Sequence, residues 1–212
     1  MQPKTNNLNL PDKYSPIPTT IVKSELTNLA KDFINTKLQY YEYVQQTTPN
    51  TNRLTYNFGY SYFKLQVGDQ SFVDIPECFI NLLQQALNQL NDIAVIRNLD
   101  ATTYKNCIVS IYGKNDKLEP HIDVVDSPKR NFYFGDDVIG IVIEPDSEGK
   151  FYILKSESSQ SPIYNSNTAM HVDEQAGSAF LLGGINRKFP YYHGVSPVAK
   201  KRVSITFRTV CF

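Results

Sequence analysis

After Asp100 the chain is made of short runs of β-forming residues, each bounded by turn residues. Gly, Pro, Asp and Ser separate these runs, which lie at 105–112, 138–144, 150–155, 178–182 and 202–208. Short strands at such spacing, without an internal repeat, are typical of a β-sandwich or β-barrel. We therefore expect the C-terminal half to fold as one of these.

Two amphipathic segments precede this β-rich region. Apolar residues recur at helical spacing over roughly 22–37 and again over 75–90. Asp74, Pro76 and Glu77 fit the cap, first turn and capping-box position at the start of the second segment. The sequence therefore predicts an α+β fold in which two helices pack outside the β part.

The rest of the chain sets the expected domain organisation. Residues 1–18 are polar with four prolines, and they predict a flexible N-terminal arm. Residues 19–212 predict a single domain, with the β core at about 100–212. Residues 45–52 predict a loop. The aromatic segment 53–67, broken by a glycine, predicts a hairpin or an ordered aromatic loop rather than a core strand.

Composition excludes several classes of protein. Hydrophobic residues make up 41% and charged residues 20% of the 212 residues, which excludes a disordered or fibrous chain. Lys and Arg balance Asp and Glu at 21 each, which excludes a strongly basic nucleic-acid coat or a polybasic membrane tether. The three cysteines have no CxxC spacing, so we expect reduced thiols in the cytoplasm or another reducing compartment. No apolar run approaches about 18 residues and the N-terminus has no signal-peptide pattern, so we expect no membrane span and no secretion. We also expect a monomer.

The chain has only three histidines, and two of them begin a His-x-Asp pair. In an extended segment, His121 and Asp123 point to the same face, so that an imidazole and a carboxylate project together. With His193, 72 residues further on, they would complete the facial triad of non-haem Fe(II) oxygenases. His171 and Asp173 have the same spacing, but only 22 residues separate His171 from His193. That is tight for strands on opposite sides of a barrel, so we interpret His171 as a structural or rim histidine.

The last predicted strand, 202–208, reads Arg-Val-Ser-Ile-Thr-Phe-Arg. Alternation puts Arg202, Ser204, Thr206 and Arg208 on one face and the apolar residues on the other. Arginines on the interior face of a barrel need anions to pair with. At about 3.3 Å per residue their Cα atoms lie roughly 20 Å apart, which leaves room for one small dicarboxylate between the side chains. The alternative is an exposed edge strand with solvated arginines, but the nearby triad favours the interior.

Over about residues 50–210 the sequence resembles the AlkB family of Fe(II)/2-oxoglutarate-dependent dioxygenases. The matching segments are NCIVSIYGKNDKLEPHID, GSAFLLGGINRKFPYYHGVSP, KRVSITFR and NRLTYNFGYSYF, the last followed by the helix after Pro76. They resemble the family's metal-pair strands, its distal-histidine segment, its R-x-N-x-T-F-R strand and its nucleotide-recognition lid. The resemblance implies a double-stranded β-helix (jelly-roll) core, N-terminal helices packed outside it and an aromatic lid hairpin at about 50–67.

The resemblance also implies the catalytic metal site. His121, Asp123 and His193 would be the ligands of Fe(II) and the catalytic residues. 2-Oxoglutarate would be the co-substrate, together with O2.

A second group of residues would hold 2-oxoglutarate by the same resemblance. Arg202 would bind its distal carboxylate, and Arg208 would lie near the carboxylate at the iron end. Tyr112 matches the family tyrosine that hydrogen-bonds the co-substrate. Ser110 and Ser204 stand where many members have asparagine, and they keep a shorter hydrogen-bonding group.

For the substrate, the resemblance implies N-methylated bases in single-stranded or flipped-out nucleic acid, with release of succinate, CO2 and formaldehyde. An extruded base stacks on aromatic faces, for which Tyr56, Phe58, Tyr60 and Tyr62 are candidates unless they pack into the core. Val125 occupies a position that is acidic in several nucleic-acid demethylases. This residue and the zero net charge favour an alternative, a hydroxylase or demethylase of a protein side chain or small molecule. A third hypothesis is a jelly-roll binding protein without chemistry, which would take up no iron.

Overall fold

The computed structural model describes residues 17–48, 51–60, 73–93, 100–123, 132–158, 160, 162–183 and 187–212. Its helices are α1 (Ser24–Thr36), α2 (Glu77–Ile93) and the short 3-10 helices η1 (Leu38–Tyr40) and η2 (Ala101–Thr103). Its strands are β1 (Thr19–Ile21), β2 (Tyr43–Thr48), β3 (Thr51–Gly59), β4 (Tyr104–Tyr112), β5 (Leu118–His121), β6 (Tyr133–Glu144), β7 (Phe151–Lys155), β8 (Met170–His171), β9 (Ser178–Leu182), β10 (Tyr191–Val195) and β11 (Arg202–Cys211).

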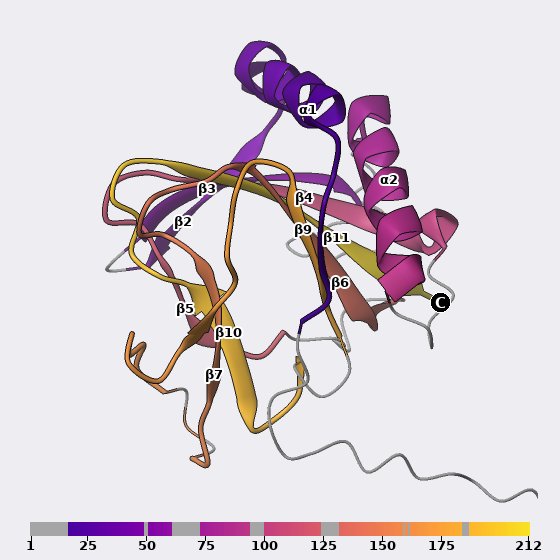
Figure 1. Cartoon of the computed structure of the whole chain (residues 1–212). Helices are drawn as coiled ribbons and strands as arrows, with labels where there is room; N and C mark the ends of the chain where they lie inside the picture. Colours follow the sequence, from indigo (N-terminus) through magenta and orange to yellow (C-terminus); the bar gives the residue numbers. More distant parts are fainter. Residues whose placement is uncertain are drawn as a thin grey trace, which may run out of the picture.

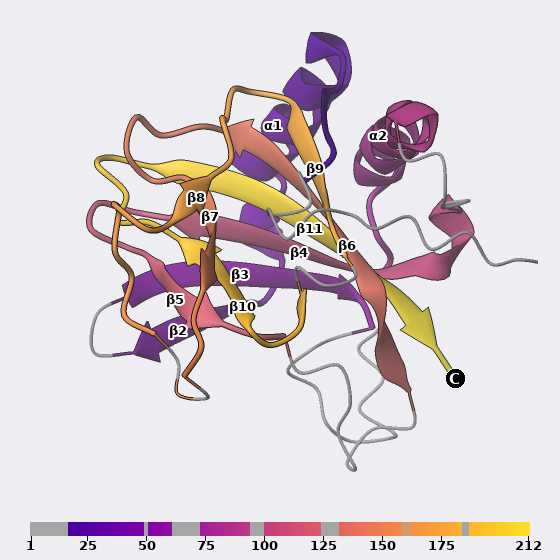
Figure 2. The same cartoon turned by 60° about the horizontal axis from the view of Figure 1, so that its bottom comes forward.

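The strands form two antiparallel sheets that face each other (Figures 1 and 2). The larger, seven-stranded sheet has the order β1-β9-β6-β11-β4-β3-β2. The smaller, four-stranded sheet has the order β5-β10-β7-β8. Successive strands alternate between the two sheets from β4 to β7 and again from β8 to β11, as in a jelly roll. The predicted α+β fold with a double-stranded β-helix core is therefore confirmed.

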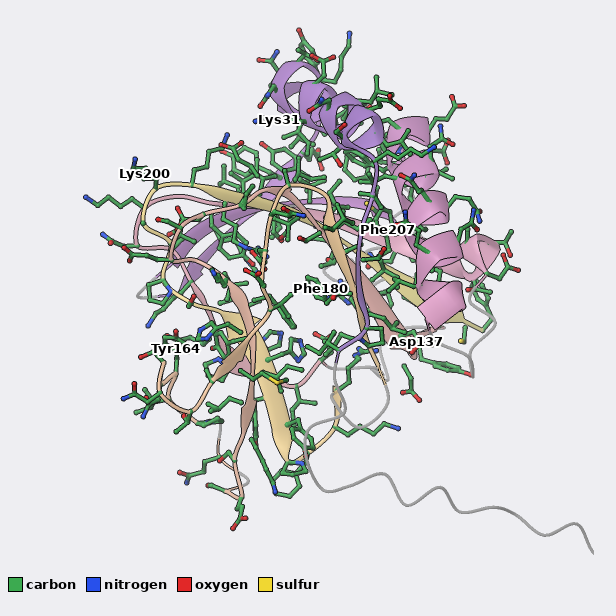
Figure 3. The ribbon with its side chains drawn as sticks, viewed as in Figure 1. Lys31, Asp137, Tyr164, Phe180, Lys200 and Phe207 are labelled. Atoms are coloured by element: carbon green, nitrogen blue, oxygen red, sulfur yellow. The ribbon has the colours of Figure 1, made fainter. Side chains whose placement is uncertain are left out.

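Helices α1 and α2 cover the outer face of the larger sheet (Figure 1). Phe79 and Leu83 of α2 pack with Ile205 and Phe207 of β11 in one apolar core. Phe180 belongs to a second core between the two sheets, and Figure 3 shows Phe207 on the helix side and Phe180 between the sheets. Both predicted helices are confirmed. In the part of the chain that the structure describes, neither helix is long and apolar enough to cross a membrane.

The segment between the helices differs from the prediction. Residues 45–52, predicted as a loop, mostly belong to a hairpin of β2 and β3 in which Thr48 pairs with Thr51. Strand β3 lies between β2 and β4 inside the larger sheet, so the prediction of a non-core segment is wrong for 53–59. Strand β2 is the edge strand, where polar residues are tolerated, and its polar composition therefore showed no core pattern.

The end of the predicted N-terminal arm also contributes a strand. Strand β1 pairs with β9 at the other edge of the larger sheet. Next to it, the Val22 N–H donates to the Gly177 carbonyl at 2.9 Å. Residues 1–16 of the predicted arm lie outside the described residues.

Gly140 of β6 lies under the ring of its cross-strand neighbour Phe180, and an added Cβ would overlap that ring. The ring is itself stacked on Phe151, with 4.5 Å between centroids. We therefore expect Gly140→Ala to lower the free energy of unfolding by about 1–3 kcal/mol, measured by urea denaturation. The double variant Gly140→Ala/Phe180→Leu should recover part of the loss. An unchanged midpoint in the single variant would show that the ring moves aside at no cost.

Candidate metal centre and co-substrate pocket

Strands β5 and β10 bring three potential metal ligands together between the sheets. His121 ends β5 and pairs directly with His193 of β10, and Asp123 follows two residues after His121. Asp123 Oδ1 lies 3.5 Å from His121 Nε2 and 3.7 Å from His193 Nε2. One ligand atom from each residue lies within 4.8 Å of the others. The predicted grouping of these three residues is confirmed.

The backbone orients the His121 imidazole, and the two histidine rings pack against each other. His121 Nδ1 lies 2.9 Å from the Glu119 carbonyl, so that it donates there and leaves the Nε2 lone pair for a metal. The His121 and His193 rings lie 4.4 Å apart by centroid, tilted by 51°. His193 is buried, whereas the side chain of His121 is 35% exposed.

Two arginines hold the second oxygen of Asp123. Arg187 Nη2 lies 3.0 Å and Arg208 Nη2 3.6 Å from Asp123 Oδ2, and Arg187 Nη1 donates to the Gly135 carbonyl at 2.6 Å. Burial alone would raise the pKa of Asp123, but the charge of Arg208 and the interactions of both histidines with the carboxylate hold that pKa well below its usual value. The group is therefore a carboxylate, with Oδ1 turned toward the histidines.

This donor set fits Fe(II). Two imidazoles and one carboxylate on one side of a metal leave its other positions open, which is the facial arrangement of non-haem iron oxygenases. A cavity of about 410 Å³ adjoins the three ligands and would accommodate 2-oxoglutarate and O2.

The predicted co-substrate residues all line this cavity from the larger sheet. Across β11 and β4, Arg202 pairs with Tyr112 and Ser204 pairs with Ser110. Arg208 lies further along β11, at the iron end beside Asp123. The alternation predicted for 202–208 therefore holds, and its polar face points between the sheets.

Arg202 already has a carboxylate partner that no sequence pattern predicted. Its Nε donates to Glu174 Oε2 at 2.9 Å, and its Nη2 donates to Glu174 Oε1 at 2.7 Å. Its Nη1 donates to Ser204 Oγ at 2.9 Å. The Arg202 and Glu174 side chains are 1% and 0% exposed. One full edge of the Arg202 guanidinium is therefore occupied by the protein itself.

A second arginine, also missed from the sequence, lies beside the same tyrosine. Arg53 of β3 donates from Nη1 to the Tyr112 hydroxyl at 3.1 Å. The guanidinium carbons of Arg53 and Arg202 each lie 5.6 Å from the centre of the Tyr112 ring. Alternation along β3 places Arg53 and Thr55 in the cavity. The sequence would predict this position if 53–59 were taken as a core strand.

The proposed stacking residues do not share one surface. Tyr56 and Phe58 are 8% and 0% exposed and belong to the core under the helices, where Phe58 packs edge-on against Phe79. Their prediction as substrate-binding faces is wrong, because the alternation of β3 turns them away from the cavity. Tyr60 is half-buried, and Tyr62 lies outside the described residues.

The rival His-x-Asp pair is not part of the site. His171 Nε2 lies 2.9 Å from the Tyr164 hydroxyl, which supports its interpretation as a structural histidine. The Asp173 side chain is fully exposed and lies 3.8 Å from Lys150 Nζ. Figure 3 shows Tyr164 at the smaller sheet, away from Phe180 in the space between the sheets.

Burial and the neighbouring His121 lower the pKa of His193 from 6.5 to about 4. The unfolded chain takes up a proton near pH 6.5 that the folded, metal-free protein excludes. The free energy of unfolding of the metal-free protein should therefore fall as the pH is lowered from about 6.5 to 4, by up to about 1.4 kcal/mol per pH unit from this group. Denaturation curves over this range measure the slope. The slope should be shallower in His193→Gln, and equal slopes would contradict the assignment.

Solved structures of other proteins have a similar architecture. No family model and no curated protein matches the chain. The structure of OsALKBH1 matches with a TM-score of 0.62 and 15% identity, over 93% of this chain and 100% of that one. A prolyl hydroxylase from Trichoplax adhaerens, in complex with a hypoxia inducible factor peptide fragment, matches with a TM-score of 0.55 and 14% identity, over 91% and 83%. An oxidoreductase of the 2OG-Fe(II) oxygenase family from Burkholderia pseudomallei matches with a TM-score of 0.56 and 14% identity, over 90% and 84%. The chain therefore has the fold of the 2-oxoglutarate-Fe(II) oxygenases, with a His121, Asp123 and His193 facial triad inside it.

Proposed function

We propose that this protein is an Fe(II)/2-oxoglutarate-dependent dioxygenase that demethylates N-methylated bases in single-stranded or flipped-out nucleic acid. The observation that carries the chemistry is the triad of His121, Asp123 and His193 beside a cavity that also contains Arg202 and Arg208. The sequence resemblance to the AlkB family and the match to the OsALKBH1 structure support the choice of nucleic acid.

Bound Fe(II), with 2-oxoglutarate and O2, would supply oxidative decarboxylation coupled to hydroxylation of a substrate C–H bond, and a hydroxylated N-methyl group then loses formaldehyde. The polar residues of the site would have two tasks. His121 and His193 present Nε2 lone pairs, and Asp123 presents Oδ1. Arg187 and Arg208 keep Asp123 ionised and aligned through its other oxygen.

Apolar side chains from both sheets form much of the cavity wall and keep water from the reacting C–H bond. They include Ile108, Leu118, Val138, Phe151, Phe180 and Leu182. The protein thus surrounds one open, charged metal site with an apolar lining, which suits hydrogen abstraction from a positioned methyl group.

An aromatic group near the iron end offers a surface for a base. It consists of Tyr60, Phe132 and Phe212, in which the Tyr60 ring lies 5.0 Å and 5.3 Å from the other two. Asn106, which pairs with Arg208 across β4 and β11, donates to the Tyr60 carbonyl at 2.5 Å. Lys105 Nζ lies 6.0 Å from the Phe212 ring. An exposed Phe212 ring and two half-buried rings beside a cation suit a base and its phosphate.

The test is formaldehyde release from single-stranded oligonucleotides that carry 1-methyladenine or 3-methylcytosine, with Fe(II), 2-oxoglutarate and ascorbate. We expect release by the wild type and none by His121→Ala. If the wild type converts 2-oxoglutarate to succinate but releases no formaldehyde from any oligonucleotide, the nucleic-acid substrate is wrong and the oxygenase chemistry stands.

A protein side chain or small molecule is the second candidate substrate. The burial of Tyr56 and Phe58 favours it, because two of the four predicted base-stacking residues are unavailable. The structure of a prolyl hydroxylase in complex with a peptide fragment, which has a similar fold, also supports a protein substrate. Succinate that forms only when a peptide or metabolite is added would identify this second function.

A further inference from the structure

Strand β5 has an irregularity directly before the metal ligand His121. One residue of β10, Gly194, lies opposite two residues of β5, Glu119 and Pro120. Such a β-bulge bends its strand and changes the direction of the groups beside it. The carbonyl of the bulged Glu119 lies 2.9 Å from His121 Nδ1. The bulge therefore presents the backbone oxygen that orients the His121 ring.

Tyr152 of β7 reaches this bulge from the outer face of the smaller sheet. Its two neighbours in β7 belong to the core between the sheets, so the Tyr152 side chain projects to the other side. Tyr152 pairs with Gly194, and its hydroxyl donates to the Leu118 carbonyl of β5 at 3.3 Å. A Cβ on Gly194 would overlap both the hydroxyl and that carbonyl. The lack of a side chain at Gly194 thus lets the tyrosine cross β10 and contact the strand that carries His121.

The surroundings of Tyr152 hold its ring in this position. Tyr152 is fully buried although it projects from the outer face, and the Tyr164 ring packs against it with 4.7 Å between centroids. The Tyr164 hydroxyl lies 2.9 Å from His171 Nε2, which fixes the covering ring in turn. Burial and the charge of Glu119 raise the pKa of Tyr152. The hydroxyl therefore stays protonated and can donate to β5.

We propose that Tyr152 is a positioning residue of the metal centre, which holds the β5 bulge so that the Glu119 carbonyl faces His121 Nδ1. A hydrogen bond at Nδ1 fixes the tautomer and the plane of the imidazole, and it leaves the Nε2 lone pair for the metal. Tyr152 acts through the backbone of β5 and not on the metal itself. The proposal rests on the metal site of the proposed function, but it does not depend on whether the substrate is nucleic acid or protein.

The test compares two variants of the full-length protein that each lose one buried tyrosine hydroxyl. Tyr152→Phe removes the donor to β5. Tyr192→Phe is the matched control, because the Tyr192 hydroxyl also donates to a carbonyl at 3.3 Å, that of Ser158, which lies outside β5. Calorimetric titration with Mn(II) measures metal affinity without turnover. Tyr152→Phe should raise the Kd about 3–10-fold, less than the loss of a direct partner of a ligand, and Tyr192→Phe should stay within about 2-fold of the wild type.

A second measurement follows the His121 ring in the metal-free protein. The chain has only three histidines, so NMR can resolve their ring nitrogens at about pH 8, where an imidazole is neutral. The His121 signals should be those of the Nδ1–H tautomer in the wild type and in Tyr192→Phe, and they should move toward a mixture of tautomers in Tyr152→Phe. Equal Mn(II) affinities and equal His121 signals in the two variants would overturn the proposal, even if both unfold at lower urea. No Mn(II) binding by the wild type would instead reject the metal centre of the proposed function, and this role with it.

Discussion

Asp123→Ala is expected to abolish Fe(II) binding and to lower 2-oxoglutarate turnover at least about 1,000-fold. The variant loses the carboxylate of the triad and leaves the charges of Arg187 and Arg208 beside two imidazoles, where they repel a cation. Metal content after dialysis against Fe(II) or Mn(II) measures the first effect, and succinate formation measures the second.

The chain contains a matched control for this experiment. Asp173 stands in the same His-x-Asp context as Asp123, but its side chain is fully exposed at the surface. Asp173→Ala should keep both the metal and the activity. If Asp123→Ala retained stoichiometric metal, the triad would not be the metal site.

Arg187→Met should lower the free energy of unfolding of the metal-free protein by about 3–5 kcal/mol. The Arg187 and Asp123 side chains are 2% and 5% exposed, so the substitution leaves a buried carboxylate with one of its two arginine partners. The affinity for Fe(II) should also fall about 10–100-fold, because Asp123 loses the group that aligns it. Urea denaturation and metal titration measure the two effects separately.

The neighbouring lysine serves as the control. Lys188 Nζ lies 3.5 Å from Asp136, and both side chains are about 60% exposed (64% and 60%). Lys188→Met should change the free energy of unfolding by under about 1 kcal/mol. Equal effects of Arg187→Met and Lys188→Met would show that burial of the Arg187–Asp123 pair has no special energetic role.

Periodicity in the sequence predicts much of the fold, and a short motif predicts part of the metal site. The alternation of 202–208 predicted that Ile205 and Phe207 lie on the opposite face from Arg202 and Arg208. In the structure the first two residues pack under the helices and the two arginines line the cavity. The period of 3.6 located both helices. The spacing of His121 and Asp123 predicted that their side chains project together, since that geometry is local.

The same local reasoning failed where a strand's neighbours decide its environment. The polar sequence of β2 predicts a loop, because an edge strand can have polar residues on both faces. Without β2 as a pairing partner, the sequence of β3 does not predict a core strand. This error placed Tyr56 and Phe58 on a substrate surface, whereas the pairing of β3 with β4 turns them toward the helices.

The sequence by itself determined the helices, the inward face of the arginine strand and the His121–Asp123 pair, because each depends on periodicity or on the chemistry of a short motif. The approach of His193 to that pair depends on the pairing of β10 with β5. Only the tertiary structure decided which charges meet. Arg187 and Lys188 are adjacent in sequence, yet one is buried against Asp123 and the other is exposed. Glu174 lies 28 residues from its partner Arg202 and Arg53 lies 59 residues from Tyr112. Such pairs form because the sheets bring distant strands into register, and a buried charge then requires the partner that it finds there.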